Sequence, residues 1–145
     1  MQQGTIVNLH LARVKDTPSD PVLEATAISG HGLKGDRSCR ADNPRQVLVI
    51  DREALDVLEM KPGQLKENIT TTGLDLSLAR PGAVLFIGGR GGGVTMEIVG
   101  LCEPCGRMDA IRPGPREHLE GRRGMLAMVI EGGPIKVGDP IRLEP

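Results

Sequence analysis

Apolar residues in this chain come in short runs that are separated by turn-forming residues. The runs at 46–50 and 125–130 are each long enough for one buried strand, and residues 5–14 alternate loosely between apolar and polar positions. Such short runs between Gly, Pro and Asn clusters are typical of a β domain. We predict strands over 5–14, 22–28, 46–50, 68–72, 84–87, 94–99, 125–130, 135–137 and 141–143.

A single clear helix is predicted over residues 52–60. Asp51 is a suitable N-cap, Leu55 and Leu58 share one face, and the Pro62-Gly63 pair ends the pattern. Residues 30–43 are expected to form a long irregular loop, and the Gly-rich stretch 88–93 a hairpin between two strands. We therefore expect one domain over 1–145, mostly β and barrel-like, with a few short helices.

The amino-acid composition argues against several classes of function. The chain has 20 Gly and 11 Pro but one Phe and no Trp or Tyr, so its core must be aliphatic and it lacks aromatic platforms for base stacking. Its 18 basic and 19 acidic residues give no overall attraction to nucleic acid or membranes. Three cysteines are too few for a disulfide scaffold, and no signal peptide or membrane span is evident. We predict a cytoplasmic protein with reduced thiols.

The segment 100–107, Gly-Leu-Cys-Glu-Pro-Cys-Gly-Arg, carries the strongest chemical signal. Pro104 is suited to the first position of a helix, which would place Cys105 in the first turn. Free backbone N–H groups there favour an anion, and a thiolate is the reactive form of cysteine. The pattern predicts a reactive thiol at Cys105.

Three other interpretations of the cysteines remain open. The Cys102–Cys105 pair has the spacing of a dithiol redox site, although it follows several strands instead of opening a long early helix. A zinc site could combine Cys39, Cys102 and Cys105 with His31 or His118. Cys102 alone is also explained by burial at the end of an apolar strand.

Cationic residues follow the cysteine segment. Guanidinium groups bind phosphate oxygens in bidentate fashion, so an arginine cluster beside a thiolate favours an anion clamp. A solvated loop with weak surface ion pairs is the alternative. The cluster consists of Arg107, Arg112, Arg116, Arg122 and Arg123.

A second candidate lies in residues 32–37, Gly-Leu-Lys-Gly-Asp-Arg. The glycines permit a tight turn or a close approach to a ligand, and Lys34 or Arg37 could meet an anion. The competing interpretation is that Asp36 and Arg37 tie down the loop. The histidines indicate no Ser-His-Asp triad and no metal-binding pair.

Together these segments resemble the MOSC domain, found at the C-terminus of molybdenum cofactor sulfurases and in small free-standing proteins. Residues 32–37 resemble the family's Gly-x-x-Gly-Asp-Arg-His loop, and 67–69 with 72–74 its Glu-Asn-Ile…Gly-Leu segment. Pro104-Cys105 resembles the family's Pro-Cys site, and 121–124 with 138–139 resemble its C-terminal end. The order and spacing of these stretches agree over nearly the whole chain.

The resemblance implies a barrel-like fold and the molybdenum cofactor, a pterin dithiolene bearing a phosphate, as ligand. It assigns to Cys105 a persulfide or a bond to molybdenum, which suits a soft thiolate. Where the family loop has His after Asp-Arg, this chain has Ser38, so the role of that histidine is lost or taken by His31. The cofactor-binding residues that we expect are Lys34, Asp36, Arg37, Asn68, Arg107, Arg122 and Arg123.

The leading hypothesis is a domain that binds the molybdenum cofactor, or a sulfurated intermediate, through Cys105. It would carry sulfur or take part in molybdenum-dependent reduction of N-hydroxylated compounds. Nothing in the sequence resembles the pyridoxal-phosphate desulfurase domain of full-length sulfurases, so sulfur or electrons would come from a cysteine desulfurase or an electron-donor protein. The rivals are a non-catalytic pterin-phosphate module that uses the arginines and a dithiol redox protein.

Overall fold

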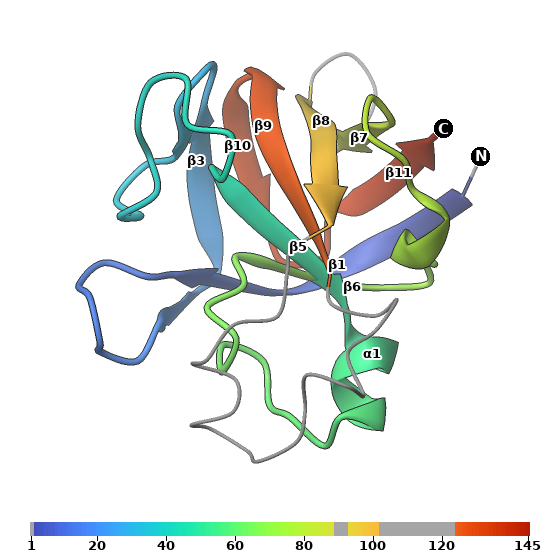
Figure 1. The fold of residues 1–145 in the computed structure, drawn as a ribbon, viewed down its shortest axis with the longest axis horizontal. Helices are drawn as coiled ribbons and strands as arrows, with labels where there is room; N and C mark the ends of the chain where they lie inside the picture. Colours follow the sequence, from blue (N-terminus) through green and yellow to red (C-terminus); the bar gives the residue numbers. More distant parts are fainter. Residues whose placement is uncertain (1, 89–92, 102–123) are drawn as a thin grey trace.

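The main feature of the fold is a closed barrel of seven strands (Figure 1). The computed structural model describes residues 2–88, 93–101 and 124–145. Neighbouring strands pair antiparallel around the barrel, except for one parallel pair, β5 and β6. The order around the barrel is β1 (Gln2–Leu11), β11 (Pro140–Glu144), β7 (Val84–Ile87), β8 (Val94–Leu101), β9 (Met125–Glu131), β5 (Val47–Asp51) and β6 (Ile69–Thr72).

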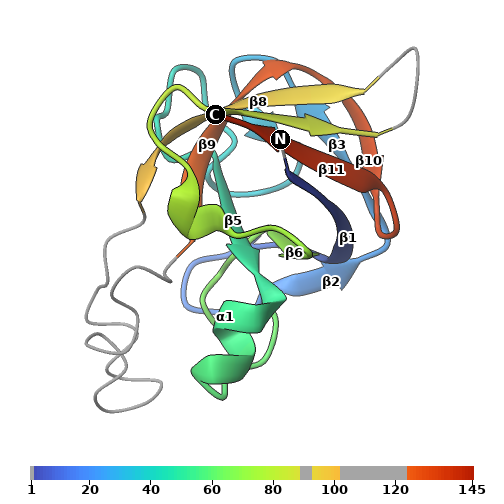
Figure 2. The same ribbon diagram turned by 90° about the vertical axis from the view of Figure 1, so that its right-hand side faces the viewer.

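Strand β1 closes the barrel because its two halves pair with different neighbours. Its first residues pair with β11, from Gln2 opposite Leu143 to Thr5 opposite Pro140. From Thr5 onwards it pairs with β6, and its last residues also pair with β2 (Asp20–Val22). A register shift between Ile6 and Asn8 accommodates the bend. The pairing with β11 also places the two ends of the described chain side by side (Figure 2).

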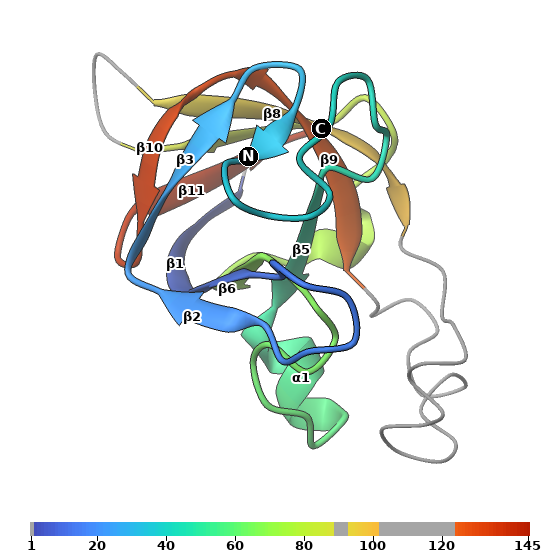
Figure 3. The ribbon, with the colours of Figure 1, turned by 90° about the vertical axis from the view of Figure 1, so that its left-hand side faces the viewer.

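A second, three-stranded sheet lies along one side of the barrel (Figure 3). It consists of β10 (Gly133–Lys136), β3 (Glu24–Ile28) and β4 (Gly32–Leu33). Ala27 and Ile135 of this sheet are buried in the same cluster as the barrel interior. The two sheets therefore share one aliphatic core, as the near absence of aromatic residues requires.

Strand β5 is buried on both faces, which explains its continuous apolar run. Val47 and Val49 belong to the barrel core, whereas Ile50 packs in a second cluster with Leu55 and Leu58. That cluster covers the end of β5 with helix α1 (Arg52–Val57), for which the Asp51 carboxylate caps the Ala54 N–H at 3.1 Å. In the part of the chain that the structure describes, no helix has the length and apolar character needed to cross a membrane.

The structure confirms the mostly β, barrel-like fold class but shifts several boundaries. The predicted strand 22–28 is two strands, β2 and β3, which belong to different sheets and meet at the exposed Leu23. The predicted helix 52–60 ends at Val57, because Glu59 adopts a left-handed backbone with φ of 55°. The loop predicted over 30–43 contains β4, and a 3₁₀ turn (Leu76–Leu78) follows β6. The short helices predicted beyond Cys102 lie outside the described residues.

The first strand ends at Leu11, short of the predicted residue 14. The reason lies in its hydrogen bonding. The N–H of Ala12 donates to the side chain of Asp36 and not to a neighbouring strand. Beyond that point Arg13 and its neighbours form an exposed turn.

Gly4 is the tightest point of the barrel closure, and its replacement provides a test. A Cβ at Gly4 would lie 2.2 Å from the carbonyl oxygen of Thr72, a backbone atom that cannot rotate away. We expect Gly4→Ala to lower the free energy of unfolding by about 2 kcal/mol or more. Gly100→Ala in β8 is the matched control, because its Cβ would meet no atom of residues 2–88, 93–101 and 124–145 within 4 Å. Urea denaturation of both variants would contradict this account if they were equally stable.

Candidate functional site

Asp36 is a buried carboxylate that joins the loop after β4 to the end of β1. One oxygen, Oδ1, accepts hydrogen bonds from the Ala12 N–H at 2.7 Å and from the Asn68 amide at 3.0 Å. The other, Oδ2, accepts from the Ser38 N–H at 3.0 Å. Gly35, with φ of 89°, makes the turn that brings Asp36 into this position. The side chain of Asp36 therefore ties down its loop, as one of the two sequence interpretations proposed.

Asn68 links the Asp36 side chain to two strands of the barrel. Its amide nitrogen donates to the carbonyl oxygen of His10 at 3.1 Å as well as to Asp36, and its side-chain oxygen accepts from the Leu48 N–H at 3.0 Å. Its backbone N–H and C=O bond to Leu48 and His10, each at 2.9 Å. We call this arrangement, made of the Asp36 and Asn68 side chains with their backbone partners, the Asp36–Asn68 junction.

Backbone hydrogen bonds at and next to the junction hold the loop that carries the two candidate cations, Lys34 and Arg37. The Arg37 N–H donates to the Ala12 carbonyl at 2.9 Å, and the Lys34 N–H to the Thr26 carbonyl at 2.8 Å. The side chains of Lys34 and Arg37 are exposed. The structure thus brings Lys34, Asp36, Arg37 and Asn68 to one rim of the barrel, with the cations facing solvent and the other two buried.

Glu67, next to Asn68, is a second buried carboxylate. Its two oxygens accept from the Gly63 N–H at 2.9 Å and the Leu65 N–H at 3.2 Å, which organises the turn over residues 61–66. Its side chain is fully buried, and burial raises the pKa of its carboxyl group to about 7, although backbone hydrogen bonds act in the opposite direction. The sequence marked Glu67 only as part of the Glu-Asn-Ile segment.

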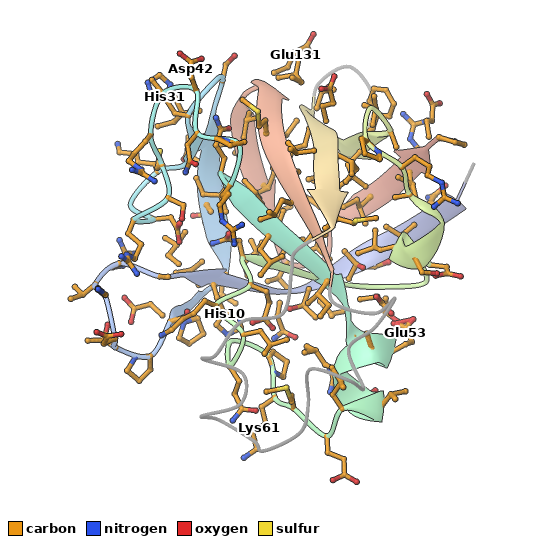
Figure 4. The ribbon with its side chains drawn as sticks, in the orientation of Figure 1. His10, His31, Asp42, Glu53, Lys61 and Glu131 are labelled. Atoms are coloured by element: carbon orange, nitrogen blue, oxygen red, sulfur yellow. The ribbon has the colours of Figure 1, made fainter. Side chains whose placement is uncertain are left out.

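His10 lies beneath the same turn. Gly63, with φ of 93°, packs on the imidazole so closely that a Cβ would stand 3.0 Å from the ring. Burial lowers the pKa of His10, and its buried Nδ1 has no hydrogen-bond partner among the residues that the structure describes. No pattern in the sequence singled out this histidine. Figure 4 shows His10 and Lys61 far from His31, whose Nδ1 lies 3.0 Å from the Ser29 carbonyl oxygen.

A cleft of about 540 Å³ opens between two turns that begin or end at the junction. The first turn follows Ala12, and the second, organised by Glu67, precedes Asn68. The ammonium group of Lys66 donates to the Thr17 carbonyl and connects the two walls. The lining consists of Asp16, Thr17, Pro18, Ser19, Lys61, Pro62, Gly63, Gln64 and Lys66.

The described strands also locate the two attachment points of the cysteine segment. Leu101, the last residue of β8, pairs with Met125 of β9, and Met125 pairs with Val49 of β5. Val49 in turn pairs with Ile69, the residue that follows Asn68. One row across the sheet therefore connects the strand ends on either side of 102–123 with the junction.

The remaining predicted site residues, Cys105, Arg107, Arg122 and Arg123, lie outside the described residues. The same holds for Cys102 and His118 of the zinc alternative. Cys39 is half-buried with a free thiol, and burial, with the nearby Asp36 charge, raises its pKa. Within residues 2–88, 93–101 and 124–145, no group of three or more His, Cys, Asp or Glu side chains could hold a metal ion.

The buried Glu67 carboxyl makes stability depend on pH. Its pKa is raised from 4.5 to about 7 on folding, so the folded protein binds this proton more tightly than the unfolded chain. The stability that this proton contributes is present below about pH 4.5 and is lost as pH rises towards 7. By pH 8 the loss is about 3 kcal/mol.

Glu67→Gln removes this titration. We expect the stability of the variant relative to wild type to increase between pH 5 and pH 8 in urea denaturation. Glu24→Gln, at an exposed position of β3, is the control and should follow the wild-type curve. Parallel curves for Glu67→Gln and wild type would show that Glu67 titrates normally.

Comparison with solved structures finds the same fold in several proteins. The YuaD protein from Bacillus subtilis has a TM-score of 0.79 at 19% identity, and the match covers 99% of this chain and 98% of that one. YiiM from Geobacillus stearothermophilus has a TM-score of 0.76 at 17% identity, covering 98% and 75% of the two chains. YiiM from Escherichia coli has a TM-score of 0.70 at 20% identity, covering 100% and 70%. At these identities the likeness establishes the fold.

A comparison with curated proteins finds no significant match. The family comparison is decisive, because the model of the MOSC domain matches residues 36–142. That range begins at the buried carboxylate of the junction and extends into β11. The resemblance seen in the sequence is thus confirmed: the chain belongs to the MOSC domain family, a family related to the molybdenum cofactor.

Proposed function

We propose that this MOSC domain binds the molybdenum cofactor, or a sulfurated form of it, at the rim beside the Asp36–Asn68 junction, with Cys105 as the reactive thiolate. The observation that carries the proposal is the meeting of two sequence motifs in one hydrogen-bonded arrangement. The Gly-Asp-Arg loop and the Glu-Asn-Ile segment join there through Asp36 and Asn68. The strand ends that flank 102–123 lie in the same row of the sheet.

The described residues fit a ligand that bears a phosphate. Lys34 and Arg37 are exposed cations on a loop whose backbone is fixed. The nearby negative charge of Asp36 is buried and hydrogen-bonded to three N–H donors, so it does not face the ligand. Arg107, Arg122 and Arg123 are proposed as further phosphate partners, since guanidinium groups bind phosphate through paired hydrogen bonds.

The role of Cys105 follows from thiolate chemistry. A cysteine near several cations has a lowered pKa and reacts as a nucleophile or a soft metal ligand. When bound, the cofactor would supply a molybdenum centre able to accept sulfur or to exchange electrons. We propose two uses for such a site: carriage of sulfur received from a cysteine desulfurase, and reduction of N-hydroxylated compounds with an electron-donor protein.

The alternative from another class is a carrier module without catalysis. It would hold the pterin phosphate through Lys34, Arg37 and the arginines, and it would be indifferent to the loss of the Cys105 thiol. The exposed cations beside the junction support this alternative as well. The effect of removing the Cys105 thiol therefore distinguishes the cysteine-dependent site from the carrier module.

The first experiment is the analysis of molybdenum and pterin in protein from a host that makes the cofactor. Wild type is expected to retain both, and Cys105→Ala to lose at least nine-tenths of the molybdenum. Cys39→Ala is the matched control, because this half-buried thiol lies on the loop near Asp36. The chain has no Trp or Tyr, so pterin emission is measured without an intrinsic background.

Each other outcome has a defined meaning. Pterin and molybdenum retained in Cys105→Ala would favour the carrier module. Protein without cofactor that gains one sulfur atom at Cys105 after exposure to a desulfurase would favour sulfur carriage alone. A Cys102–Cys105 disulfide with a measurable potential and no cofactor would establish the dithiol redox alternative.

A further inference from the structure

Asp36 and Asn68 use their hydrogen-bonding groups within the protein. Asp36 is 7% exposed and Asn68 4% exposed. Both N–H groups of the Asn68 amide are donated, one to the His10 carbonyl and one to Asp36. Asp36 accepts from two backbone N–H groups in addition to Asn68. Two residues that we expected from the sequence to bind the cofactor thus face inward, where they bind their own chain.

The partners of these side chains belong to segments that are remote in sequence. Asp36 holds the start of the turn at Ala12 and the backbone of its own loop at Ser38. Asn68 holds β1 at His10 and β5 at Leu48. The exposed Lys34 and Arg37 lie on the same loop as Asp36, and the two turns that form the walls of the cleft begin after Ala12 and end before Asn68.

A buried carboxylate is retained only where its charge is compensated. Here the compensation comes from N–H donors, because no Lys or Arg side chain bonds to Asp36 among the described residues. Removal of one acceptor would leave a buried N–H group without a partner, which is more costly than loss of an exposed contact. The loop conformation should therefore depend strongly on this one side chain.

We propose that Asp36 and Asn68 are positioning residues of the ligand site: they hold Lys34 and Arg37 in place for an anionic ligand without touching it. The inference rests on the proposed function for the identity of the ligand. It assigns the direct phosphate contacts of this loop to the two exposed cations. It also explains how a loop rich in glycine can present a fixed pair of charges.

The first test follows the loop itself by limited trypsin digestion of the folded protein. Trypsin cleaves after Lys34 and after Arg37, and the junction should hold both bonds in a protected conformation. We expect Asp36→Asn to accelerate cleavage at these two sites at least tenfold, because its amide would face an N–H donor. Cleavage after Lys136, exposed on β10, reports global unfolding and should not change. If Asp36→Asn fails to fold, Asp36→Ser retains one acceptor and replaces it.

The second test asks whether Asp36 acts through the cations. The probe is a fluorescent pterin that carries a methyl phosphate, titrated by fluorescence polarisation against cofactor-free protein. We expect the double variant Lys34→Ala, Arg37→Ala to raise the Kd at least tenfold with normal protease resistance. Asp36→Asn alone should raise the Kd at least fivefold. Added to the double variant, it should change the Kd less than twofold, since residues that act through one another are not additive.

The opposite results overturn the inference. Unchanged digestion in Asp36→Asn would show that the junction does not hold the loop. An additive loss of affinity in the triple variant, with unchanged digestion, would show that Asp36 contacts the ligand itself. Failure of the wild-type protein to bind the probe would overturn the proposed function instead, and the digestion would still decide whether the junction holds the loop.

Discussion

Closure of the barrel by β1 is the constraint on which the rest of the structure depends. A single strand of ten residues completes the sheet on both sides, with β11 along its first half and β6 along its second. This is possible because Gly4 allows the backbone of Thr72 to approach without a side chain between them. Once β1 is in place, its last residues meet the Gly-Asp-Arg loop on one side and the Glu-Asn-Ile segment on the other.

The electrostatics of the rim follow from how its acidic groups are satisfied. Asp36 and Glu67 are buried, and both are held by backbone N–H groups or an amide, not by cations. Lys34 and Arg37 are therefore not required to neutralise them and remain exposed. The buried carboxylates of Asp36 and Glu67 hold the backbone of this region, whereas Lys34 and Arg37 place positive charge on its surface. On the Gly-Asp-Arg segment the exposed charges are therefore those of Lys34 and Arg37, which would favour an anion in the proposed site.

The sequence predicted the fold class well because the strands are short apolar runs separated by turn-forming residues. The doubly buried β5 and the helix capped by Asp51 are examples, since both depend on local signals. The split between β2 and β3 was not predictable, because the continuous stretch 20–28 has no Gly to mark the change of sheet. For the site, local pattern identified the Gly-Asp-Arg loop as a candidate. It could not show that Asp36 points inward to Asn68, a contact 32 residues away. The properties of His10 and Glu67 arise from burial in the folded protein, and no local sequence pattern singled out either residue.

The separation of these partners along the chain has a consequence for how the protein folds. The bonds of the Asp36–Asn68 junction join residues 24, 32 and 58 positions apart. Contacts between such distant positions form slowly, because the entropy of closing long loops opposes them. The pairing of β1 with β11 joins positions still farther apart, from Gln2 opposite Leu143, so we expect the junction to form before the barrel closes. A newly made chain would thus organise this rim once β1, the Gly-Asp-Arg loop, β5 and the Glu-Asn-Ile segment have met, before the last strand completes the barrel.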